Sequence, residues 1–181
     1  MTLALSLLGC SGMNPQSAHM VFERANDVGF DAYVAAYSDS DTATARDSGT
    51  FVWTPADDGF SFEGSVVGDS DWTGRVDLLG EASWTESSWS GRWSIEYVEV
   101  LADGVGLDGG LSWTLDLEGD HDSGSLEFGV EGEITASGDA VGTGPVDYTA
   151  VVEITANSFS FVAEGSVDGT PIDESFTLTV L

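Results

Sequence analysis

Apolar and polar residues alternate along most of the chain after residue 50, and this period of two restricts the fold more than any other feature. Successive side chains of a β-strand point to opposite faces, so each of these segments has one apolar and one polar face. Such strands are typical of an antiparallel sheet with one face in water. The clearest inward-facing sets are Trp113, Leu115 and Leu117 in one segment and Leu126, Phe128 and Val130 in the next.

The connections between these segments are short and carry turn-forming residues. Asp-Gly pairs stand at 58–59, 103–104, 108–109 and 168–169, and Asp-Gly favours tight hairpins because both residues tolerate a positive φ. No connection after residue 50 has room for a crossover helix, so consecutive strands should pair with each other. We therefore predict a mainly β fold, an antiparallel up-and-down meander of about eight or nine strands, closed into a barrel or a strongly curled sheet.

The apolar face of such a meander has to be buried, and the interior can be filled or hollow. Phe, Trp and Leu residues crowd the inward-facing positions, which favours a filled core. The alternative is a lipocalin-like barrel whose mouth admits a small apolar ligand.

A helical segment is predicted before the strands. Asn14 is a good N-cap and Pro15 a good first helical residue. Gly29 is a plausible end of this short helix. Residues 28–37 fit a helix or a strand, and their alanines favour a helix. Residues 38–49 are predicted to form a loop or linker. The residues expected on one helical face are Ala18, Val21, Phe22 and Ala25.

The charge of the chain is strongly negative, with 32 acidic and 4 basic side chains and a formal net charge of −28. Such a surface repels phosphate backbones, so we expect no nucleic-acid partner. A hydrophobic fraction of 41 % indicates that the chain is a folded domain and not a disordered acidic tail. No catalytic motif accompanies the two histidines, His19 and His121, so we do not expect an enzyme.

Metal-ligand candidates are confined to Asp-x-Asp pairs in expected turns, where carboxylates could supply part of a calcium site. None of these pairs extends into a complete calcium-binding loop, and chance pairs are expected with so much aspartate, so no cofactor is predicted beyond this calcium option. The candidates are Asp39, Asp41, Asp69, Asp71, Asp120 and Asp122.

Residues 1–9 are almost wholly apolar and end at Cys10, which is the one cysteine in the sequence. The run Leu7-Leu8-Gly9-Cys10 resembles the lipobox of bacterial lipoproteins, in which the cysteine receives a diacylglycerol and the preceding peptide is removed. The resemblance implies that Cys10 is the lipidated residue and that the partner is a membrane, reached through the lipid anchor. Ser11 follows the cysteine, which in that family is compatible with transport to an outer membrane.

These observations divide the chain into a lipoprotein signal at 1–9, an anchor with helical segment and linker at 10–49, and a β-domain at 50–181. The expected location is the cell envelope, lipid-anchored at the outer membrane on its periplasmic or surface face. The expected function is that of an exported β-domain with a structural or interaction role, and the alternative is binding of a small apolar ligand. The sequence leaves the identity of a protein partner or ligand open.

Overall fold

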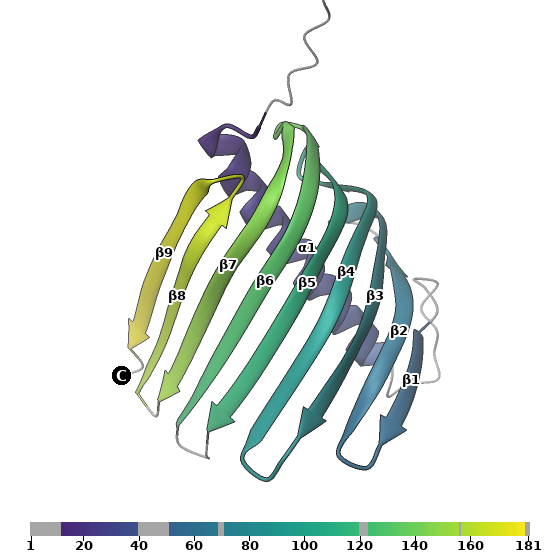
Figure 1. Ribbon diagram of the computed structural model, residues 1–181, viewed down its shortest axis with the longest axis vertical. Coiled ribbons are helices and arrows are strands. Elements are labelled where there is room, and N and C mark those ends of the chain that lie inside the picture. Colours follow the sequence, from purple (N-terminus) through teal and green to yellow (C-terminus); the bar gives the residue numbers. More distant parts are fainter. Residues whose placement is uncertain (1–11, 40–50, 69–70, 120–122, 156, 180–181) are drawn as a thin grey trace, which may run out of the picture.

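The computed structural model describes residues 12–39, 51–68, 71–119, 123–155 and 157–179 (Figure 1). In this described part of the chain, one helix precedes nine strands. The helix α1 spans Pro15–Asp39, and the strands are β1 (Phe51–Ala56), β2 (Gly59–Val67), β3 (Trp72–Trp84), β4 (Ser88–Ala102), β5 (Val105–Gly119), β6 (Ser123–Gly138), β7 (Gly142–Thr155), β8 (Ser158–Val167) and β9 (Thr170–Thr179).

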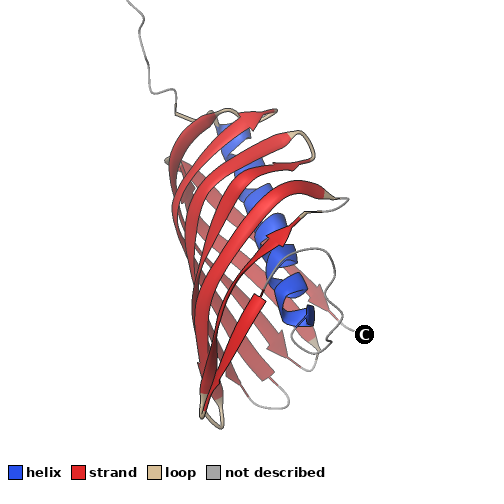
Figure 2. Cartoon of the chain, turned by 90° about the vertical axis from the view of Figure 1, so that its right-hand side faces the viewer, coloured by secondary structure: helices blue, strands red, loops and turns tan. Residues whose placement is uncertain are grey.

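The nine strands form a single sheet in which each strand pairs antiparallel with the next along the chain. This confirms the predicted meander and its strand number. Closure into a barrel is wrong, because β1 and β9 are the two ends of the sheet order and do not pair with each other. The sheet bends around α1, and this helix covers the apolar concave face of the sheet (Figure 2). In a barrel, closure of the sheet would bury the same face.

Both edge strands contain a proline, Pro55 in β1 and Pro171 in β9. Proline lacks the N–H that a further strand would need, and natural sheets use it at edges to discourage pairing with other chains. An open sheet of nine strands is therefore consistent with the placement of these two residues.

The helix begins where the sequence predicts. The Oδ1 atom of Asn14 accepts a hydrogen bond from the N–H of Ser17 at 2.9 Å, which is the N-cap contact, and Pro15 is the first helical residue. The expected end at Gly29 is wrong, since α1 continues for 25 residues to Asp39 and includes the start of the expected linker. Gly29 instead provides a close approach to the sheet. A Cβ atom there would lie 2.8 Å from the Oη of Tyr97.

The concave face of the sheet and the inner face of α1 share one hydrophobic core. On the helix, the completely buried positions recur every three or four residues and are small, which lets α1 lie close to the strands. These positions are Ala18, Val21, Ala25, Val28 and Ala32.

The predicted inward-facing residues of β5 and β6 do share the concave face. Cross-strand pairs join Trp113 to Val130, Leu115 to Phe128 and Leu117 to Leu126. Only the first pair is buried, however, and Leu117 is 40 % exposed. The helix runs diagonally from β8 and β9 towards β2, so it leaves the lower parts of β5 to β9 uncovered in the view of Figure 1.

Two of the Asp-Gly pairs form the predicted tight turns. Both residues have positive φ at Asp103–Gly104 (45° and 82°) and at Asp168–Gly169 (48° and 72°), as a type I′ turn requires. The prediction of a turn at Asp108–Gly109 is wrong, because this pair lies inside β5. Gly109 stands opposite Tyr97, beside a shift of register between β4 and β5, and takes a φ of 126°.

Candidate functional site

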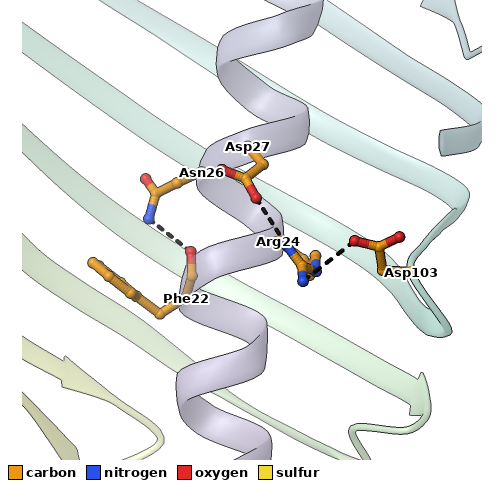
Figure 3. Close-up of polar contacts among 5 residues, drawn as sticks. All are labelled: Phe22, Arg24, Asn26, Asp27 and Asp103. Atoms are coloured by element: carbon orange, nitrogen blue, oxygen red, sulfur yellow. Dashed lines mark hydrogen bonds and ion pairs between the residues drawn. The ribbon is translucent and has the colours of Figure 1, made fainter. Parts of the chain in front are cut away.

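A cavity of about 690 Å³ lies between α1 and the sheet. Its lining comes from both flanks of the helix, and Figure 3 shows Phe22 and Asn26 on one flank with Arg24 and Asp103 on the other. Cavities of this size are in the range that holds small organic ligands. The sheet residues among those that line it include Trp72, Trp113, Phe128, Val130, Tyr148, Ala150 and Phe161.

Asn26 organises the first flank. Its side-chain N–H donates to the carbonyl oxygen of Phe22 at 2.7 Å, and its Oδ1 accepts a hydrogen bond from the Oη of Tyr148. The rings of Phe22 and Tyr148 meet edge to face with centroids 5.0 Å apart. Burial raises the pKa of Tyr148 above its ordinary value, so this hydroxyl stays a hydrogen-bond donor at neutral pH.

Tyr97 ties the helix to the sheet beside this flank. Its Oη donates to the backbone carbonyl of Ala25 at 2.7 Å, and the side chain is fully buried. Burial raises the pKa of Tyr97, and the neighbouring Tyr148 raises this pKa further. The two hydroxyls therefore hold successive positions of α1, residues 25 and 26, from the concave face.

The second flank is charged. Arg24 contacts Asp27 at 2.9 Å and Asp103 at 3.3 Å, as Figure 3 shows. Because the Arg24 side chain is 28 % exposed and both carboxylates lie mostly in water, these pairs contribute little to stability. The Arg24 guanidinium, with its charge neutralised by these carboxylates, lies at the edge of the cavity.

Trp113 lines the cavity with an indole that is 7 % exposed. Its Nε1 atom is buried, and among the described residues it has no hydrogen-bond partner. A buried donor without an acceptor costs about 1–3 kcal/mol, so an oxygen atom of a ligand would be a favourable neighbour for this N–H.

An apolar strip continues from the cavity towards the sheet edge. We use this name for the concave side chains Ile154, Phe159, Phe161, Phe176 and Leu178 of β7 to β9. Phe161 belongs to the cavity lining and stacks on Phe176 with centroids 5.4 Å apart. Phe176 and Leu178 are 49 % and 59 % exposed, so the strip is open to solvent although it lies on the concave face.

The predicted site residues contribute little to this cavity. Asp71 lines it, and Asp39 is the last residue of α1. Among the described residues, no group of three metal-ligating side chains is close enough to hold an ion. Outside the described residues lie Cys10, Asp41, Asp69, Asp120, His121 and Asp122.

Sequence reasoning missed Arg24 and Asn26 as residues of a site. A signal for Asn26 was present, because asparagine is a poor residue for a helix interior and here stands beside the apolar face at Ala25. The other histidine, His19, lies on α1 with its Nδ1 3.9 Å from a carboxylate oxygen of Glu174 in β9. Both side chains are about half exposed, so His19 lies at the surface near the start of the helix.

No helix in the described part of the chain has the length and apolar character needed to cross a membrane. Comparison with protein-family models, with curated proteins and with solved structures found no match. A proposal for the function of this protein therefore rests on the cavity and the residues around it.

Proposed function

We propose that this protein is a binding domain that takes an apolar ligand between α1 and the concave face of the sheet. The observation that carries the proposal is the cavity of about 690 Å³ with its predominantly aromatic and aliphatic sheet wall. Ligand sites of this kind are concave, mostly apolar and equipped with a few fixed polar groups. Here Asn26, Tyr148 and Trp113 supply fixed polar groups within the apolar wall, and charged side chains, including Arg24 and Asp103, also line the cavity.

The open sheet supports this proposal over a filled core. Because β1 and β9 do not pair, the concave face can be reached from the side, along the apolar strip. Phe128 and Phe161 are only half-buried, so each ring still has apolar surface that a ligand could cover. Their burial by a ligand would contribute about 25 cal/mol for each Å² removed from water.

We also propose that the domain works at the cell envelope, held by a lipid on Cys10. The support is the resemblance of Leu7-Leu8-Gly9-Cys10 to a lipobox. The structural or interaction role expected from the sequence is the second candidate, and the exposed apolar strip beside the β9 edge is the observation in its favour.

Binding of N-phenyl-1-naphthylamine, a neutral apolar dye that brightens in apolar surroundings, tests the ligand site. Ala150 is buried and lines the cavity, so Ala150→Phe should fill it and weaken dye binding at least about tenfold. Val151 is its neighbour on the convex face of β7, which makes Val151→Phe the matched control. Circular dichroism checks that both variants are folded.

Unchanged dye affinity in a folded Ala150→Phe variant would contradict the proposal. Equal losses in both variants would show that the dye reports stability of the sheet and does not report occupancy of the cavity.

A further inference from the structure

Two neighbouring indoles of the core have N–H groups without an acceptor. Trp93 of β4 and Trp113 of β5 form a cross-strand pair, and their rings are stacked with centroids 6.5 Å apart and an interplanar angle of 18°. Both Nε1 atoms are buried, and neither has a hydrogen-bond partner among the described residues. An indole N–H lies in the plane of its ring, so two stacked rings do not accept it from each other. Buried donors in proteins are almost always paired, so two unpaired donors side by side are unusual.

Of these two indoles, Trp113 belongs to the lining of the cavity. A Cβ atom at Gly29 would lie 3.3 Å from the Cζ2 atom of Trp113. Cζ2 is two bonds away from Nε1, so the N–H edge of this indole lies near the turn of α1 that contains Gly29. Trp93 lies outside the lining and is stacked against Tyr33, with ring centroids 5.2 Å apart. A ligand between α1 and the sheet therefore meets the donor of Trp113 and does not meet that of Trp93.

Two further polar side chains of the lining already satisfy each other. The Asn26 amide donates a hydrogen bond to the Phe22 carbonyl and accepts one from the Tyr148 hydroxyl. An indole N–H can only donate. A ligand that pairs with Trp113 must therefore present an acceptor, such as the oxygen atom of a ketone or an ester.

A charged acceptor is disfavoured at this place. Arg24 is the basic residue among those that line the cavity, and its guanidinium is already paired with Asp27 and Asp103. Burial of a carboxylate without a counter-ion is costly. The formal net charge of −28 also repels an anion before it reaches the protein. A neutral acceptor avoids both costs.

We infer that the ligand of this cavity is a neutral apolar ketone or ester whose carbonyl oxygen accepts a hydrogen bond from the Trp113 N–H. The inference rests on the proposed function and adds the chemical class of the ligand and the residue that selects it. Because Nε1 is buried in this structure, contact with the carbonyl requires a small shift of the lining. Phe128 is the diagonal neighbour of Trp113 across β5 and β6, and its half-buried ring is free to make this shift towards solvent.

Three probes with the same benzene ring test the inference: acetophenone, α-methylstyrene and benzoate. In α-methylstyrene a methylene group replaces the carbonyl oxygen, so the acceptor is lost and the shape is kept. In benzoate an anionic oxygen replaces the methyl group. Displacement of N-phenyl-1-naphthylamine from the full chain measures the three affinities, and benzoate should bind at least about tenfold more weakly than acetophenone.

Trp113→Phe removes the donor and keeps an aromatic ring. It should weaken acetophenone about three- to tenfold relative to α-methylstyrene, which is the range expected for one hydrogen bond. The matched control is Trp93→Phe, which removes the other unpaired N–H of the stacked pair but leaves the lining intact. This control should leave the ratio of the two affinities unchanged. Circular dichroism checks that both variants are folded.

Nuclear magnetic resonance of the indole N–H groups adds a readout that a change in packing alone would not produce. The chain has six tryptophans, and the signal that is missing in Trp113→Phe belongs to Trp113. Acetophenone should move this signal downfield of its position with α-methylstyrene, because the two probes share a ring and differ in the acceptor. If Trp113→Phe does not fold, the unchanged protein still gives this test, since one indole signal should respond differently to the two probes.

An equal loss of acetophenone and α-methylstyrene in Trp113→Phe, or equal indole shifts with the two probes, would overturn the inference. A change of the affinity ratio in Trp93→Phe as large as in Trp113→Phe would also overturn it, because the ratio would then follow the packing of the indole pair. Benzoate that binds as tightly as acetophenone would refute a neutral ligand. Each of these results leaves the proposed function standing, whereas failure of the dye itself to bind would refute both.

Discussion

Gly29→Ala gives a test of the contact between helix and sheet. Alanine is favoured over glycine inside a helix by about 0.8–1.0 kcal/mol, so an isolated or loosely docked α1 would be stabilised by this change. In the structure, the new Cβ would lie 2.8 Å from the Oη of Tyr97, 3.2 Å from the Cδ1 of Ile95 and 3.3 Å from the Cζ2 of Trp113. All three side chains are buried.

The shortest of these contacts, with the Tyr97 hydroxyl, decides whether Gly29→Ala raises or lowers the free energy of unfolding. The Tyr97 hydroxyl is held by its hydrogen bond to the Ala25 carbonyl, so it cannot move away from Gly29 without losing that bond. Overpacking of a core costs about 1–3 kcal/mol, and the gain in helix propensity offsets only part of it. We expect Gly29→Ala to lower the free energy of unfolding by about 1 kcal/mol.

Tyr97→Phe removes the obstructing oxygen and provides the control. By itself it should cost about 0.5–1.5 kcal/mol for the lost hydrogen bond. In this background Gly29→Ala should be neutral or stabilising, so the two changes should show a coupling of about 1 kcal/mol in a double-mutant cycle.

Urea unfolding of the four proteins, followed by far-ultraviolet circular dichroism, measures this cycle. Midpoints are comparable if the slopes agree. Stabilisation by Gly29→Ala in the presence of Tyr97, at the full value of the helix propensity, would refute the close docking of α1 and with it the cavity wall.

Four further predictions concern stability and anchoring. The contribution of Tyr97 and Tyr148 to the free energy of unfolding should be fully present below pH ~10 and be lost as the pH rises above it, because the unfolded chain loses phenolic protons that the two buried side chains retain when folded. Urea midpoints measured on both sides of this pH check the fall, and Tyr97→Phe should reduce it. The melting temperature should rise by at least about 2 °C between 0.01 M and 0.5 M NaCl as self-repulsion is screened, and a flat curve in calorimetry would contradict this. Phe128→Ala should cost about 2 kcal/mol in urea unfolding, less than the ~3–5 kcal/mol of a fully buried ring, whereas Glu127→Ala on the wet face should change stability by less than about 0.5 kcal/mol. Expressed with a functional signal, the protein should partition into detergent and Cys10→Ala should not; equal partitioning would refute the lipid anchor.

Much of the fold follows from local patterns in the sequence. The parity of Trp113, Leu115 and Phe128 is set by alternation within one strand, and it predicts the shared face of β5 and β6 correctly. The N-cap at Asn14 and the turn at Asp103–Gly104 also depend on a few neighbouring residues. Each of these features needs no knowledge of distant parts of the chain.

The candidate site could be predicted only in part. Alternation assigns Trp113, Phe128 and Tyr148 to the interior, but it does not tell a buried residue from one that lines a cavity. That difference depends on the diagonal course of α1 over the concave face, which leaves Phe128 half-buried and Leu117 exposed. The pairing of Asn26 with Tyr148 joins residues 122 positions apart and has no local signal.

The alternation of residues, the start of the helix and the pairing of consecutive strands could be predicted from the sequence, because they depend on backbone geometry over short distances. Whether the sheet closes depends on contacts between distant parts of the chain. The helix covers the concave face, so β1 and β9 remain edges. The same contacts override two local signals. Gly29 continues a helix because the sheet leaves no room for a side chain there, and Asp108–Gly109 continues a strand opposite the ring of Tyr97.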